Sequence, residues 1–65
     1  KRKIIFIVNP ISGHHNKSQF PNLVNSLIDK NKYDYKIVYT EYVNHATELT
    51  MKAIEEEYDF MFPSN

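Results

Sequence analysis

Hydrophobic residues in the first half of the chain change from an unbroken run to a helical repeat. Residues 4–8 form a continuous apolar stretch of strand length, typical of a central parallel strand that is covered on both faces. Turn-forming residues at 9–13 end this strand. From Ser18 onward the apolar spacing predicts a helix that is capped by Ser18, carries Pro21 in its first turn and fades over residues 29–31. Its expected buried stripe is Phe20, Leu23, Val24, Leu27 and Ile28.

The second half of the chain repeats the strand and helix pattern. Alternating side chains at residues 35–40 predict a second strand with one mixed face, as expected near the edge of a sheet. Asn44 can cap a second helix, which we expect to end near Glu57. A third apolar stretch starts with Tyr58, Phe60, Met61 and Phe62. The expected buried stripe of the second helix is Ala46, Leu49, Ala53 and Ile54.

This order of elements, with short connections, predicts an α/β fold: a three-layer βαβαβ unit on a parallel sheet. We expect the strand order 2-1-3, with the two helices on opposite faces. One helix cannot cover a whole face of three strands, so apolar sheet should stay bare around Phe60 and Phe62. The pattern therefore predicts the front part of a larger domain.

Composition narrows the classes of partner. The 65 residues carry eight basic and eight acidic side chains, so no field of one sign draws the chain toward nucleic acid. Apolar residues make up 42%, yet they never run for the eighteen or so positions of a spanning helix. The absence of cysteine fits a reducing compartment, and we expect a cytoplasmic protein. A chain this short has little stability to spare, which favours association or a longer protein.

Candidate chemistry lies in the connections after the strands. Ligands of parallel sheets bind beyond the carboxyl ends of the strands, where helix N-termini present free N–H groups. Gly13, the single glycine, lets the backbone approach an anion, while Ser12 and Asn9 can donate hydrogen bonds and Lys17 adds positive charge. The alternative is a tight connection, because turn chemistry alone explains these residues. The segments expected at this rim are residues 9–17, 40–44 and 63–65.

Two motifs in combination are more specific than the first loop alone. The first strand ends in Asn-Pro-Ile-Ser-Gly at residues 9–13, and the next strand–helix junction reads "TEYVNHATEL" at residues 40–49. In motif order and spacing the chain resembles the amino-terminal part of the diacylglycerol kinase catalytic domain, over essentially all of its length. That family includes bacterial lipid kinases and the sphingosine and ceramide kinases. The implied fold is part of an N-terminal domain of the NAD kinase and diacylglycerol kinase type.

The resemblance implies ATP-dependent transfer of the γ-phosphoryl group to a lipid hydroxyl, with magnesium. It implies a first nucleotide-contacting loop at residues 9–13 and a further nucleotide contact from the end of the second strand. His45 and Ala46 match the family's His-Ala, which implies packing and shaping of the nucleotide side rather than proton transfer. It identifies no catalytic or metal-binding residue within this chain. The implied nucleotide-binding residues are Asn9, Pro10, Ile11, Ser12, Gly13 and Thr40.

One departure limits the expected activity. In the family the third strand leads into Gly-Gly-Asp-Gly-Thr, and residues 63–65 stand where that loop should begin. We therefore expect residues 1–65 to be the N-terminal part of a nucleotide-binding domain, truncated before this loop and inactive alone, because phosphoryl transfer depends on complete positioning of the phosphates. The lipid acceptor, and any peripheral contact with a membrane, would involve the missing part. The alternative is a small non-catalytic α/β module that forms a homodimer through its uncovered sheet.

Other candidate groups have simpler interpretations. His14, His15 and His45 could be imagined as metal ligands, but adjacent histidines point apart on most backbones and are more simply exposed loop residues. The acidic run at residues 55–57 faces several directions on a helix, as a solvated surface does. The aromatic residues could stack on bases, yet no basic groove accompanies them. Those expected in the core are Phe6, Phe20, Phe60 and Phe62.

Overall fold

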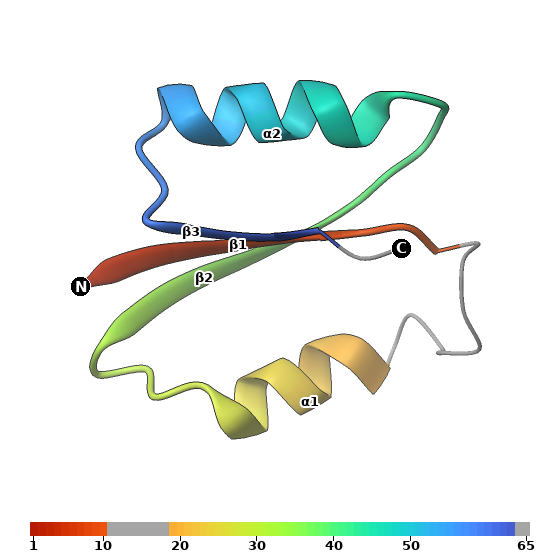
Figure 1. Ribbon diagram of the computed structural model, residues 1–65. Helices are drawn as coiled ribbons and strands as arrows, with labels where there is room; N and C mark the ends of the chain where they lie inside the picture. The colour runs from red at the N-terminus through yellow and green to blue at the C-terminus, as the bar shows by residue number, and fades with distance from the viewer. Residues whose placement is uncertain (11–18, 64–65) are drawn as a thin grey trace.

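Three parallel strands form a single sheet between two helices in the computed structural model, which describes residues 1–10 and 19–63. Figure 1 shows α2 on one side of the sheet and α1 on the other. The predicted three-layer arrangement is therefore confirmed. In chain order the elements are β1 (Arg2–Val8), α1 (Gln19–Leu27), β2 (Tyr33–Tyr39), α2 (His45–Glu55) and β3 (Phe60–Pro63).

The strand order is β2-β1-β3, as the sequence predicts. In the β1–β2 pair, Ile4 lies opposite Tyr35 and Val8 opposite Tyr39, and in the β1–β3 pair Ile4 lies opposite Phe60. Both strand pairs are parallel, so all three strands end at the same rim of the sheet. This common rim positions the candidate site.

The face under α2 holds the tightest packing. Ile5 and Ile7 project toward α2 and are 4% and 1% exposed, and Ala53 of the helix is 1% exposed against them. Alanine at this position lets the helix approach the sheet closely. The half-buried residues around this cluster are Val38, Leu49, Tyr58 and Met61.

The face under α1 is built from aromatic rings. Phe6 meets Phe20 of α1 edge to face, with ring centroids 5.8 Å apart, and stacks on Phe62 at 5.5 Å. Such pairs add stability beyond the area they bury. Phe60 and Phe62 are nevertheless 37% and 50% exposed, because α1 joins β1 to β2 and leaves β3 open. The predicted bare sheet is confirmed, whereas their placement in a closed core is wrong.

The apolar stripes of the helices are narrower than the spacing predicts. In α1, Val24 is buried at 6% exposure, but Leu23 and Leu27 are 54% and 75% exposed. In α2 the buried line is Leu49 and Ala53, while Ile54 turns away from the sheet and is 60% exposed. Each helix rests on the sheet along a single line of residues four apart, so apolar residues beside that line stay in solvent. Ala46, in the first turn of α2, is likewise exposed.

The helix boundaries also differ from expectation. Asn44 does precede α2, but its φ of 70° is left-handed and its side chain makes no capping hydrogen bond. Its carbonyl accepts from the N–H groups of Thr47 and Glu48 instead, at 3.1 and 3.4 Å. α2 ends at Glu55 rather than Glu57, and α1 ends at Leu27, before residues 29–31. Ser18, the expected cap of α1, lies outside the described residues.

Candidate nucleotide-binding site

The carboxyl ends of β1 and β2 lie side by side. Val8 and Tyr39 are register partners, and the Thr40 N–H donates to the Val8 carbonyl at 2.9 Å. Asn9 and Thr40, the next residues of the two strands, therefore leave the sheet as neighbours. Figure 1 shows both chain exits on the side of the sheet where α2 also begins. This rim is where parallel sheets bind ligands.

The structure reaches only part of the predicted nucleotide loop. Asn9 and Pro10 are half-buried at the end of β1, and Thr40 is half-buried after β2. The structure thus brings the first loop residues and Thr40 together at one rim. Ile11, Ser12 and Gly13 lie outside the described residues, so their nucleotide contacts stay a prediction.

A compact group of contacts shapes the chain immediately after Thr40. The Glu41 N–H donates to Nδ1 of His45 at 2.9 Å, and the His45 N–H donates to the Tyr42 carbonyl at 3.1 Å. The imidazole also stacks on the Tyr42 ring, with centroids 4.3 Å apart and planes 17° from parallel. His45 therefore connects the first turn of α2 to the segment that leaves β2.

Tyr42 links this group to the next turn of the helix. Its hydroxyl donates to a carboxylate oxygen of Glu48, and the ring itself is 55% exposed. The hydrogen bond to Glu48 raises the pKa of Tyr42, and desolvation and the negative charges of Glu48 and Glu41 act in the same direction. A tyrosine is ordinarily neutral at physiological pH, and this upward shift of the Tyr42 pKa further favours the neutral form that donates to Glu48. Glu48 also lies in the first turn of α2, where the helix dipole favours a negative charge.

Sequence reasoning did not foresee this role for Glu41, Tyr42 and Glu48. The resemblance drew attention to His45, but not to the atom that accepts from the Glu41 amide. The available signal was spacing: Glu41 and His45 are four residues apart across a strand–helix junction. Spacing alone could not show that Asn44, the residue directly before His45, takes a left-handed conformation.

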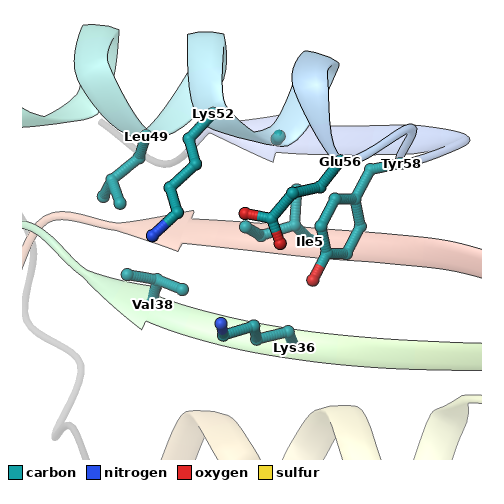
Figure 2. Close-up of a pocket in the computed structure, with 8 residues that line it drawn as sticks. Ile5, Lys36, Val38, Leu49, Lys52, Glu56 and Tyr58 are labelled. Atoms are coloured by element: carbon teal, nitrogen blue, oxygen red, sulfur yellow. The ribbon is translucent and has the colours of Figure 1, made fainter.

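A separate hollow of about 170 Å³ lies between α2 and β2. Figure 2 shows Lys52 and Glu56 reaching from the α2 side toward the sheet, with Lys36 on β2 opposite them. The hollow carries both signs of charge, so it does not form the cationic cradle that phosphates need. Its floor and remaining wall are Ile5, Val38, Leu49, Ala53 and Tyr58.

Neither a metal cluster nor a spanning helix is found in the parts of the chain that the structure describes. Across residues 1–10 and 19–63, no three His, Asp or Glu side chains gather closely enough to hold a metal ion. No helix in the same ranges is long and apolar enough to cross a membrane.

The fold and the rim define an α/β domain of the kind that binds ligands beyond the ends of parallel strands. A family model described as the diacylglycerol kinase catalytic domain matches residues 3–63, nearly the whole chain. The chain therefore belongs to the diacylglycerol kinase catalytic domain family, a family of kinases. No curated protein and no solved structure matched it.

Proposed function

We propose that these residues form the ATP-binding portion of a lipid kinase that phosphorylates a lipid hydroxyl of the diacylglycerol type. Family membership over residues 3–63 supports the kinase class. The single observation that carries the site is the adjacency of Asn9 and Thr40 at the carboxyl rim, fixed by the 2.9 Å bond from Thr40 to Val8.

In the proposed site the contacts to the nucleotide come from the ends of two neighbouring strands. Residues 9–13 would contact the phosphates through backbone N–H groups and short polar side chains, and the Thr40 hydroxyl would donate from the neighbouring strand. When bound, ATP supplies the phosphoryl group and Mg²⁺ offsets its negative charge. The resemblance places the metal ligands of the family beyond the segment that matches residues 1–65, so we assign Mg²⁺ binding to that later part of the domain.

The domain assignment rests on the same family. The chain has one glycine, so the family's Gly-Gly-Asp-Gly-Thr loop is not among these 65 residues. We propose that residues 1–65 are the N-terminal part of the nucleotide-binding domain, inactive without that loop because its phosphate contacts are missing. The lipid acceptor would bind the remaining part, and the whole protein would be cytoplasmic with peripheral contact at the membrane.

Nucleotide titration tests the binding role directly. Addition of millimolar ATP to the chain should shift the amide resonances of Gly13 and Thr40 more than those of Lys36 or Glu56, which line the hollow elsewhere. Thr40→Ala should weaken binding about two- to tenfold, the usual worth of one hydrogen bond. Thr47→Ala, an exposed threonine of α2, is the matched control and should change nothing. Unmoved resonances at Gly13 and Thr40 would count against the assignment.

A second candidate function is self-association through β3. Residues 60–63 carry no charge, and edge strands without charged side chains pair readily with another chain. Phe62→Ser should lower the sedimentation-derived dimer fraction, whereas Met51→Ser, at a residue of α2 that is 61% exposed, should leave it unchanged. A tight dimer that ignores ATP would favour this module over the kinase portion. A monomer at all concentrations would exclude it.

A further inference from the structure

The hydrogen bond between Glu41 and His45 has a chemical requirement. Nδ1 of an imidazole can accept a hydrogen bond only when it carries no hydrogen of its own. The 2.9 Å hydrogen bond from the Glu41 N–H therefore requires that Nδ1 of His45 is unprotonated. The other nitrogen, Nε2, then holds the hydrogen of the neutral ring. A second proton would have to enter at Nδ1, where it would face the N–H from which Nδ1 now accepts.

The hydrogen bond between Glu41 and His45 holds the backbone next to Thr40, the candidate nucleotide contact. Glu41 directly follows Thr40, whose own N–H is held by Val8 at 2.9 Å. The Thr40 backbone is thus tied on one side to β1 through Val8 and on the other to α2 through Glu41 and His45. The second tie exists only while Nδ1 of His45 is unprotonated.

We propose that His45 is a positioning residue that makes the nucleotide site sensitive to protons, releasing the Thr40 end of the site when the imidazole becomes charged. The proposal rests on the proposed function, because it concerns the same rim. It involves no covalent step. The proton comes from solvent, and its only effect is to turn Nδ1 from an acceptor into a donor.

The groups around the imidazole determine where the protonated ring settles. In the described ranges the Tyr42 ring stacks on it and the Glu41 amide donates to it, while the carboxylates of Glu41 and Glu48 act on that same Tyr42 side chain. Nearby carboxylates and an aromatic face attract an imidazolium. The charged ring is therefore expected to stay near Tyr42 while it loses Glu41, which loosens residues 40–42 without unfolding α2.

Nucleotide affinity should depend on pH in one direction. The neutral ring holds the segment, so affinity should be highest at pH values where the imidazole is neutral and should fall as the ring takes up a proton. Loss of one positioning hydrogen bond corresponds to about a three- to tenfold weaker binding at the acidic end.

Substitutions at His45 separate the effect of its protonation from the effect of losing its hydrogen bond. In His45→Asn the side-chain oxygen can take the place of Nδ1 as an acceptor but does not titrate, so ATP affinity should stay close to the high-pH value at every pH. His45→Ala lacks the acceptor and should bind weakly at every pH. ATP itself takes up a proton near neutral pH, which can change its affinity without any role of His45. The His45→Asn variant measures this contribution of the ligand alone.

A measurement without nucleotide tests the switch independently. The Glu41 amide proton shift should follow the His45 imidazole titration in the full chain and should be flat in His45→Asn. The proposal is overturned if the Glu41 amide ignores that titration, or if His45→Asn and the unmodified chain show the same pH dependence of ATP binding. If the Glu41 amide titrates as expected but ATP does not bind at any pH, the proton-sensitive contact between His45 and Glu41 stands, and the proposed nucleotide-binding function fails.

Discussion

The two faces of the sheet share the same strands and differ in how completely they are covered. Under α2, Ile7 and Ala53 are each 1% exposed. On the α1 side, Val24 of the helix is buried at 6%, but Phe62 of β3 keeps 50% of its surface in solvent and Leu27 of the helix keeps 75%. β1 supplies alternate residues to both faces, so the strand sequence is not the cause. The difference lies in what each helix covers.

Each helix lies over a different part of the sheet. α1 joins β1 to β2 and stays near that pair, whereas α2 joins β2 to β3 and passes over β1. The open part of the α1 face is therefore β3, with Phe60 and Phe62, and the open part of the α2 face is β2, where the hollow around Lys36 lies. The α1 face is aromatic and apolar where it is open, while the α2 face is charged there. Because exposed apolar surface favours association, we propose that any further contact forms on the α1 face rather than on the α2 face.

The largest effect expected from this comparison comes from truncation of the buried strand residue on the α2 face. Ile7→Ala removes a side chain that is 1% exposed, and large-to-small changes at such sites cost about 2 to 5 kcal/mol. A chain of this length has only about 3 to 10 kcal/mol of stability, so the variant should be mostly unfolded or strongly destabilised. Urea denaturation followed by circular dichroism measures the loss.

The matched change on the other face is Leu27→Ala. Leu27 is 75% exposed, and surface substitutions usually stay within about 0.5 kcal/mol. Equal losses for Ile7→Ala and Leu27→Ala would show that the α1 face is covered in solution, and the contrast between the faces would then be lost.

Enlarging a residue at the contact between α2 and the sheet sharpens the comparison. Ala53→Leu adds volume where the helix lies against Ile5 and Ile7, and overpacking of this kind costs about 1 to 3 kcal/mol. Ala46→Leu adds the same volume to the same helix at an exposed position and should cost almost nothing. Thermal unfolding of the two variants side by side gives the answer. If Ala53→Leu is as stable as Ala46→Leu, the contact between α2 and the sheet is packed less tightly than the low exposure of Ala53 suggests.

The strand order was predictable from the sequence because it depends on local patterns. Residues 4–8 are apolar throughout and the helical segments repeat every three to four residues, which leaves few topologies for two crossovers. The bare sheet at Phe60 and Phe62 was predictable from the number of helices. By contrast, the exposure of Leu23, Leu27 and Ile54 depends on how each helix tilts on the sheet, which spacing does not encode.

The candidate site was predictable to a smaller extent. Strand ends place Asn9 and Thr40 at one rim by topology alone. The bond from Glu41 to His45 accompanies a left-handed conformation at Asn44, a backbone choice that asparagine permits but does not require. The sequence thus located the site but not the atoms that hold it.

The smallest expected effect on stability comes from the C-terminal end of α2, where the chain leaves the helix and returns to the better covered face of the sheet. The Glu57 N–H donates to the Ile54 carbonyl at 3.1 Å and the Tyr58 N–H donates to the Ala53 carbonyl at 3.0 Å, the hydrogen-bond pair of a Schellman motif. Glu57 takes the left-handed position with φ 61°, where glycine is normally found. The motif returns Tyr58 to the Ala53 cluster, so it contributes to the closed core.

Glu57→Gly should therefore stabilise the chain. A left-handed residue with a Cβ costs about 1 to 2 kcal/mol, and the greater flexibility of glycine in the unfolded chain cancels part of that gain. A net gain of about 0.5 kcal/mol is expected, which corresponds to a rise of about 2 to 4 °C in Tm for a domain of this size. Glu57→Ala keeps the Cβ but removes a negative charge near the helix C-terminus, so it isolates the electrostatic part. If both variants gained the same stability, the negative charge of Glu57 rather than its backbone conformation would be what destabilises this end of α2.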